Sequence, residues 1–113
     1  MSNPKLIHRF LKSDLFKKRA FDLNAWKEID ALKFVLDTTP EAGDVIPNGR
    51  GLRKVRMALQ GRGKRGGARV IYYQVVDEFI LLIDLYSKNE KSSLSADELK
   101  AAVEVRDEML KQI

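Results

Sequence analysis

The sequence contains no cysteine and one histidine. The absence of cysteine excludes disulfides and thiolate metal sites, and it agrees with a reducing compartment. A lone histidine, His8, does not support a zinc site or a histidine-based nucleophilic site, so we interpret it as an ordinary surface or edge residue. Asp44, Asp77 and Asp84 show no magnesium-binding spacing. We therefore expect neither a metal nor another cofactor.

Long apolar runs are also missing. No stretch approaches the roughly 18 apolar residues that a membrane-spanning helix needs. Charged residues interrupt the N-terminal stretch, which does not resemble a secretory signal. A chain of 113 residues with 44% hydrophobic and 33% charged residues predicts one globular domain over residues 1–113, with no membrane partner and a cytoplasmic location.

Acidic residues are missing from Val45 to Val76. Eight basic residues lie in this stretch: Arg50, Arg53, Lys54, Arg56, Arg62, Lys64, Arg65 and Arg69. Removing these eight from the 21 Lys and Arg leaves 13 against 16 Asp and Glu, so the rest of the chain carries a formal charge of −3. Such an asymmetry predicts a polyanionic partner, most often nucleic acid, whereas the plainer interpretation is a solvated basic loop.

The N-terminal third predicts a short strand followed by two helices. Residues 5–10 could form the strand. Ser13 or Asp14 could cap a helix that runs to about residue 21. Asn24 is a plausible cap for the second helix, which the Thr-Thr-Pro sequence after it should end.

From residue 52 the apolar residues recur with a period of two, which predicts a strand. Its two faces are Val55, Met57 and Leu59 on one side and Lys54, Arg56 and Ala58 on the other. If the apolar face meets the helices, two cations stand side by side on the opposite face. Like charges in that position repel, and an anion between them explains the pair better than stability does.

The segment QGRGKRGG is a loop by composition. It matches the G-x-G-x-x-G pattern, but a β-branched and aromatic segment follows it rather than a helix, which excludes a dinucleotide-binding site. Two interpretations remain for the glycines. They let the backbone approach phosphates, or they form a long flexible turn.

Residues 69–76 and 79–86 predict two further strands, with a turn at Asp77-Glu78. Strands that follow one another through hairpins form an antiparallel sheet. Ser95 and Glu98 then form a capping box, and Leu94 and Leu99 a hydrophobic staple, at the start of a last helix whose apolar stripe is interrupted at Arg106. We therefore predict an α+β fold: an antiparallel sheet of three to four strands, two N-terminal helices and one C-terminal helix, with the helices against one sheet face.

Basic residues from several of these strands could converge at one end of the sheet. They are Lys54, Arg56, Arg69, Lys88 and Lys91. Such a cluster suits RNA cleavage by attack of a 2′-hydroxyl on the adjacent phosphate, in which arginine offsets the developing phosphoryl charge. A lysine crowded by like charges could act as base or acid. The alternative is phosphate binding without chemistry, which needs only charge.

Four motifs occur together between residues 43 and 100: GDVIP, GLRKVR, GKRGGARVIYY and LYSKNEK. In this combination the sequence resembles the RelE/ParE superfamily of type II toxins, and within it the HigB-like branch. The resemblance covers roughly half of the chain. It implies a small toxin that enters the ribosomal A site and cuts mRNA there, without a metal, and that is inhibited by a cognate antitoxin, usually a helix-turn-helix protein of the HigA kind.

The resemblance also assigns residues. The catalytic basic residues correspond to Lys54, Arg56, Arg69, Lys88 and Lys91. Contacts to RNA or to the ribosome are expected from Arg50, Arg53, Arg62, Lys64, Arg65, Tyr73, Tyr86 and Asn89. Two positions depart from RelE: Asn89 stands where RelE-type members carry arginine, and no tyrosine follows Tyr86, whereas RelE has a late catalytic tyrosine. Tyr86, Tyr73 or Tyr72 could stack on a base or pack within a strand.

Two other functions fit parts of the pattern. A ParE-like toxin that poisons DNA gyrase would share the fold without the basic catalytic set. A nucleic-acid-binding module without catalytic activity would need only the charge.

Overall fold

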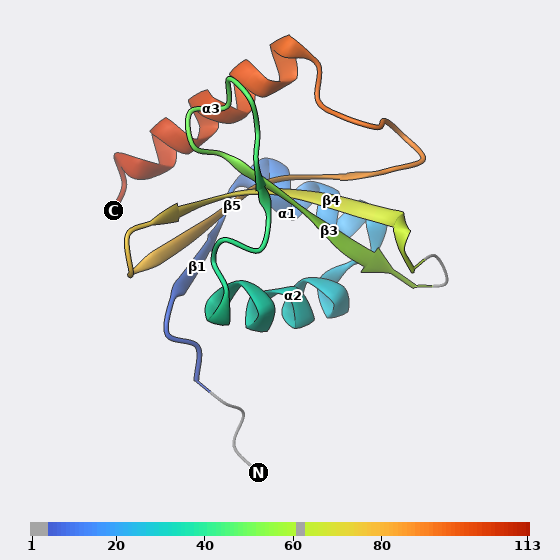
Figure 1. Cartoon of the computed structure of the whole chain (residues 1–113), viewed down its shortest axis with the longest axis horizontal. Coiled ribbons are helices and arrows are strands. Elements are labelled where there is room, and N and C mark those ends of the chain that lie inside the picture. Colours follow the sequence, from blue (N-terminus) through green and yellow to red (C-terminus); the bar gives the residue numbers. More distant parts are fainter. Residues whose placement is uncertain (1–4, 61–62) are drawn as a thin grey trace.

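The computed structural model describes residues 5–60 and 63–113. In chain order, the described elements are β1 (Arg9–Lys12), α1 (Asp14–Leu23), α2 (Trp26–Thr38), β2 (Asp44–Val45), β3 (Arg53–Leu59), β4 (Gly63–Val75), β5 (Phe79–Ser87) and α3 (Ala96–Leu110). Figure 1 shows the strands in the middle of the molecule, with α3 on one side of them and α2 on the other. None of the described helices is both long and apolar enough to cross a membrane.

The described strands form one mixed sheet in the order β1-β5-β4-β3-β2. β3, β4 and β5 pair antiparallel through hairpins, as the sequence predicted. The predicted sheet of three to four antiparallel strands was incomplete. β1 pairs parallel with β5, with Arg9 opposite Phe79, and β2 adds two residues beside β3. A parallel pair joins segments that lie far apart in the chain, so no turn sequence announces it.

Helices cover both faces of the sheet, whereas the sequence analysis placed them on one face. One core cluster joins α1 and α2 to Val70 and Tyr72. The other joins α3 to Ile71 and Ile83. Every residue of β5 after Phe79 is buried. Its sequence FILLIDLYS is an almost continuous apolar run, which is typical of a strand covered on both sides.

β1 begins later than predicted because the residues before it bind α2 instead. The backbone N–H groups of Ile7 and His8 donate to the carboxylate of Asp37 at 2.9 and 2.7 Å. His8 Nδ1 lies 2.9 Å from the same carboxylate, and the ring is buried. His8 is therefore not the surface or edge residue that the sequence suggested.

The first of the two predicted helix caps in this region is confirmed and the second is wrong. Ser13 caps α1: its hydroxyl accepts from the N–H of Phe16 at 2.9 Å and donates to the carbonyl of Ile83 at 2.6 Å. Asn24 ends α1 in the left-handed conformation, with φ of 51°, which asparagine tolerates better than most residues. α2 follows from Ala25 without a side-chain cap.

The predicted glycine-rich loop is partly a strand. β4 begins at Gly63, which pairs with Leu59 of β3. Lys64 and Arg65 thus lie on strand backbone, while Arg62 lies outside the described residues. Pairing of β3 and β4 extends farther toward the hairpin tip than glycine composition indicated, because tertiary pairing overrides weak local preference.

α3 begins with the predicted capping box. The Ser95 hydroxyl accepts from the N–H of Glu98 at 3.1 Å, and the Glu98 carboxylate accepts from the N–H of Ser95 at 2.9 Å. Leu94 and Leu99 pack against the core cluster on the α3 face of the sheet. The N-terminus of α3 is therefore fixed close to the end of β5.

Arg106 explains the interruption in the apolar stripe of α3. Its Nη1 donates to the carbonyl of Arg50 at 2.8 Å, and its Nε donates to Asp107 at 2.7 Å. The guanidinium lies 4.4 Å from the centre of the Tyr73 ring. A buried arginine with these contacts ties the end of α3 to the turn before β3.

Candidate active site

Three side chains form a row across the central strands. Arg56 of β3 lies opposite Arg69 of β4, and Arg69 lies opposite Tyr86 of β5. Residues that are directly opposite share one sheet face and stand about 5 Å apart at Cβ. Tyr86 belongs to the core cluster of the α3 face, so the row lies on that face. We call Arg56, Arg69 and Tyr86 the cross-strand row.

The cross-strand row passes from solvent into the interior. Arg56 is exposed, whereas Arg69 is 5% exposed and Tyr86 is 0% exposed. Nη1 of Arg69 donates to the carbonyl of Ala68 at 3.1 Å. Two guanidinium groups that face each other across a strand pair repel. An anion bound between them would relieve this repulsion through charge-assisted hydrogen bonds.

The hydroxyl of Tyr86 is buried and has no hydrogen-bond partner within the part of the chain that the structure describes. Buried polar atoms are nearly always paired, so an orphan of this kind calls for a ligand or a water. Burial raises the pKa of Tyr86, and the nearby Arg69 opposes this shift only in part. The phenol therefore stays protonated at neutral pH and offers a donor at the inner end of the row.

Lys54 lies beside Arg56 on the same face of β3. Val55 and Met57 pack into the core cluster that contains α2, which confirms the alternation predicted for this strand. Lys54 is half-buried and lies opposite Ile71, which belongs to the core cluster of the α3 face. The predicted pair of neighbouring cations therefore exists on the face that carries the row.

Three further predicted residues lie in the segment 88–91 after β5. The N–H of Lys88 donates to the carbonyl of Gly67 at 2.9 Å, which places this lysine next to the strand that carries Arg69. Lys88 and Asn89 are exposed. Nζ of Lys91 lies 5.7 Å from the centre of the Tyr86 ring, within the range of a cation–π contact. The segment thus adds cations around the buried end of the cross-strand row.

Other predicted contact residues lie away from the row. Arg53 projects from the opposite face of β3, where its guanidinium donates to the carbonyl of Gly43 at 2.7 Å. Arg50 is in the turn before β3, and the ring of Tyr73 lies under Arg106. The side chains of Arg62, Lys64 and Arg65 lie outside the described part.

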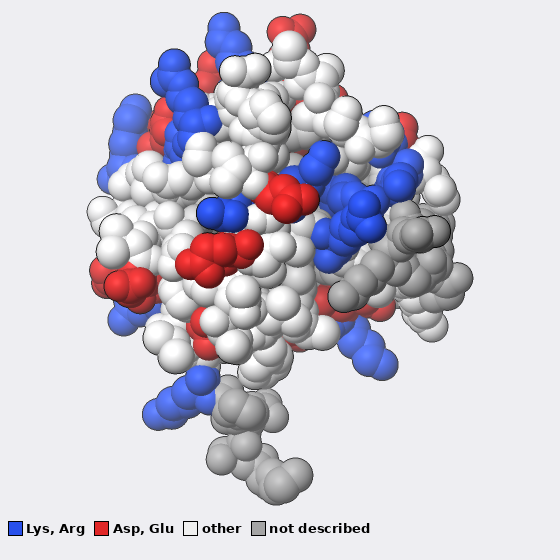
Figure 2. Space-filling model, in the orientation of Figure 1, with Lys and Arg blue, Asp and Glu red and all other residues white. Residues whose placement is uncertain are grey.

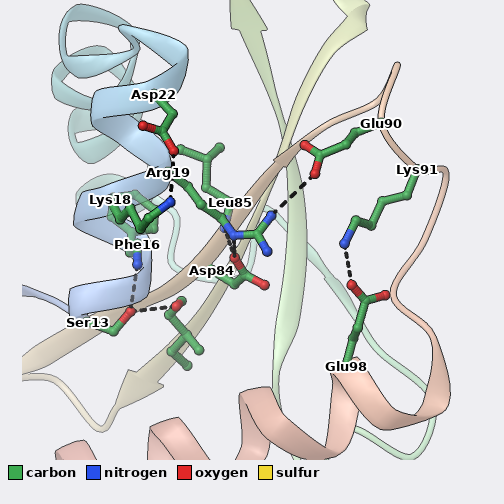
Figure 3. A network of polar contacts seen from close by, with 11 residues as sticks. Ser13, Phe16, Lys18, Arg19, Asp22, Asp84, Leu85, Glu90, Lys91 and Glu98 are labelled. Atoms are coloured by element: carbon green, nitrogen blue, oxygen red, sulfur yellow. Dashed lines mark hydrogen bonds and ion pairs between the residues drawn. The ribbon is translucent and has the colours of Figure 1, made fainter.

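A network of acidic and basic side chains that the sequence did not predict lies beside the site (Figure 3). Nε of Arg19 in α1 lies 3.2 Å from the carboxylate of Asp84, and its Nη1 lies 3.7 Å from Glu90. Burial raises the pKa of Asp84, while the N–H of Leu85 and Arg19 oppose the shift. A single acid within the apolar run of β5 was the available signal, since a buried charge needs a partner.

Glu98 was predicted only as a helix cap, and it has a second contact. Its other carboxylate oxygen accepts a hydrogen bond from Nζ of Lys91. This bond, with the N–H of Ser95, lowers the pKa of Glu98 to about 2, so the carboxylate is ionised at neutral pH. One acid therefore links the start of α3 to a lysine over Tyr86.

The arrangement suits the binding of a phosphate group. Lys and Arg side chains gather where β3 and β4 lie at the right of the view in Figure 2. Among the described residues, no group of three or more acids or histidines could hold a metal ion. The row itself and the lysines beside it offer hydrogen-bond donors: guanidinium, ammonium and phenol. Donors of this kind stabilise negative charge on phosphoryl oxygens.

Residues 13–112 match the model of a protein family described as the RelE toxin of the RelE/RelB toxin–antitoxin system. The match begins at the cap of α1 and ends beyond α3. It therefore includes every described element except β1, and all residues of the cross-strand row.

Proposed function

The chain belongs to the RelE toxin family, and on this premise we propose that it is a toxin of the HigB-like branch that cuts mRNA in the ribosomal A site. The cross-strand row is the observation that supports this proposal. It places a buried arginine, an exposed arginine and a phenol without a described partner on one sheet face. These groups match the needs of a phosphoryl-transfer reaction that uses no metal.

The proposed reaction is attack of the 2′-hydroxyl on the adjacent phosphorus. The O2′–P bond forms and the P–O5′ bond breaks, which leaves a 2′,3′-cyclic phosphate and a 5′-hydroxyl. Arg69 and Arg56 bind the phosphoryl oxygens as their charge grows, and the Tyr86 hydroxyl donates a further hydrogen bond. Of Lys54 and Lys91, one in its neutral form takes the proton from the 2′-hydroxyl, and the other, as an ammonium, protonates the leaving oxygen.

Residues at the periphery of the site would bind the RNA on either side of the reacting phosphate. Lys88 and Asn89 are exposed beside the row and would contact RNA. Arg50, Arg62, Lys64 and Arg65 would contact ribosomal RNA, since phosphate contacts need charge rather than exact geometry. We place this activity in the cytoplasm with the ribosome. RelE toxins pair with an antitoxin, and we propose a helix-turn-helix protein of the HigA kind for this one.

The first test is primer extension on mRNA from cells that express the protein or its Arg69→Ala and Arg69→Lys variants. We expect codon-phased cuts with the wild type, and a loss of at least about a hundredfold with Arg69→Ala, because removing one donor to a developing oxyanion costs that much. Arg69→Lys keeps the charge in the buried position and controls for folding, and it should recover only part of the cutting.

Three results would contradict the proposal. DNA damage without mRNA cuts would support a gyrase poison. Salt-sensitive RNA binding without growth arrest would support a binding module without chemistry. Full cutting by a folded Arg69→Ala variant would show that the row is not the reacting site.

A further inference from the structure

The segment 88–91 is held by both α1 and α3. On one side, Glu90 lies 3.7 Å from Nη1 of Arg19, whose Nε also lies 3.2 Å from the buried Asp84 of β5. On the other side, Lys91 is bonded to Glu98 of α3. Figure 3 shows both contacts, from Glu90 to Arg19 and from Lys91 to Glu98. Side chains from two helices on opposite sheet faces therefore fix the position of the segment.

Backbone hydrogen bonds further restrict the conformation of the segment 88–91. The N–H groups of Glu90 and Lys91 donate to the carbonyl of Ser87 at 3.0 and 3.3 Å, and the N–H of Asn89 donates to the Ser87 hydroxyl at 3.2 Å. The main chain is thus folded tightly onto the end of β5. What remains to be fixed is the long side chain of Lys91, which has several rotatable bonds and loses entropy when it is ordered.

Glu98 orders the side chain of Lys91, and the Glu98 carboxylate is itself held by hydrogen bonds. One oxygen accepts from the N–H of Ser95 at 2.9 Å, while the N–H of Glu98 donates to the Ser95 hydroxyl at 3.1 Å. The other oxygen holds Nζ of Lys91, which lies 5.7 Å from the Tyr86 ring centre. The carboxylate is therefore anchored by a helix cap and directs an ammonium toward the buried end of the cross-strand row.

We propose that Glu98 is a positioning residue: it acts through Lys91 and holds the ammonium group over Tyr86 for the cleavage step. This inference rests on the proposed function. Glu98 brings a negative charge close to a site for a polyanion, which weakens RNA binding. Beyond its role in the cap of α3, Glu98 therefore serves the rate of the chemical step rather than affinity.

The test is Glu98→Gln, which retains an oxygen for the N–H of Ser95 and removes the charge. Two quantities are measured with purified ribosomes carrying mRNA: the single-turnover cutting rate, and the Kd for mRNA with 2′-deoxyribose at the cut position. We expect the rate to fall about tenfold, since small misplacement of a reacting group has effects of that size or larger. We expect the Kd to stay unchanged or to fall.

Matched variants separate positioning from folding. Glu108→Gln removes the same charge from the same helix, where Glu108 pairs with Lys111 at 3.4 Å, and it should leave the rate unchanged. Asp97→Asn removes an acid from the same first turn of α3 and keeps Ser95 and Glu98 in place, and it should also retain the rate. In a Lys91→Gln background, Glu98→Gln should have no additional effect, because the two residues act as one unit.

Several outcomes would overturn the inference. Glu98→Gln could cut at the wild-type rate, slow cutting equally when Lys91 is absent, or have its effect reproduced by Asp97→Asn. If the wild type itself does not cut mRNA, the proposed function falls and this inference falls with it. The wild-type measurement distinguishes that case from a failure of the positioning role alone.

Discussion

Tyr86 combines complete burial with a hydroxyl that lacks a partner among the described residues. At the scale of a single residue, a buried hydroxyl left without any partner would cost about 1–3 kcal/mol, so this oxygen calls for a partner such as a bound phosphate or a water. The feature therefore points to a functional demand on the phenol oxygen.

We expect Tyr86→Phe to leave the free energy of unfolding unchanged or to raise it by up to about 1 kcal/mol, because only an unsatisfied group is lost. We expect mRNA cutting to fall about a hundredfold, as for loss of one donor to a phosphoryl oxygen. Urea unfolding and single-turnover cutting measure the two effects.

Tyr73→Phe is the matched control for Tyr86→Phe. Tyr73 lies on the neighbouring strand, but its ring is under Arg106 and away from the row. Tyr73→Phe should change neither the free energy of unfolding nor the cutting rate strongly. Equal losses of activity in both variants, or a destabilised Tyr86→Phe protein with full activity, would contradict the role assigned to the Tyr86 hydroxyl.

At the scale of secondary structure elements, Asp37 holds the chain that enters β1 against the end of α2. Its carboxylate accepts from two backbone N–H groups and faces the His8 ring. Burial alone would raise the pKa of Asp37, but the hydrogen bonds from His8 and Ile7 outweigh it and leave the pKa below its ordinary value of 3.8. The ionised form is thus favoured in the folded state.

Asp37→Asn should therefore lower the free energy of unfolding by about 1–3 kcal/mol at pH 7, since hydrogen bonds to a charged group are lost. A carboxyl group whose pKa is lower in the folded than in the unfolded state stabilises the fold at pH values above the unfolded-state pKa. This stabilisation is lost as the pH falls through the folded-state pKa. The difference in the free energy of unfolding between Asp37→Asn and the wild type should therefore shrink below pH 3.8. Urea unfolding at several pH values measures it.

Asp22→Asn is the control for this pH experiment. Asp22 pairs with Lys18 at 3.3 Å on the exposed surface of α1. An exposed pair contributes about 0–1 kcal/mol, so its loss should be small. The stabilising role of the Asp37 carboxylate would be contradicted if Asp37→Asn and the wild type had the same free energy of unfolding at pH 7. It would also be contradicted if their difference stayed constant as the pH was lowered below 3.8.

Several elements were predictable because their signals are local. The capping box at Ser95 and Glu98 needs residues three apart, and the two faces of β3 follow from a period of two. The pairing of β1 with β5 has no such signal. It depends on contact between distant segments, and β1 has only four residues.

The candidate site could be predicted in part for the same reason. Alternation placed Lys54 and Arg56 on one face, but that Tyr86 lies opposite Arg69 depends on the register of β4 and β5. That register shifts between Ile71 and Tyr72, and an irregularity of this kind cannot be read from either strand alone. Sequence therefore identified the cations and missed how the phenol joins them.

At the scale of the whole molecule, one group of Lys and Arg side chains lies where β3 and β4 are placed, at the right of Figure 2. Arg56 is its exposed member in the cross-strand row. If it contacts a phosphate, Arg56→Gln should weaken RNA binding and reduce the slope of log K against log salt by about one contact. Titration of a single-stranded RNA oligonucleotide at several salt concentrations measures the slope.

Lys18→Gln removes the same charge from the surface of α1, where the side chain is 76% exposed. It should leave the slope unchanged, because α1 packs on the other face of the sheet. Equal changes of the slope in Arg56→Gln and Lys18→Gln would mean that RNA binding depends only on the net charge of the protein.

The sheet order also has a consequence for how the protein is made. β5 lies between β1 and β4, so the first strand of the chain remains unpaired until β5 has been synthesised. Glu98, which holds Lys91, follows later still, in the first turn of α3. The groups that would cut RNA therefore come together only after β5 and the start of α3 have been synthesised. A nascent toxin chain would be inert toward the ribosome that is producing it.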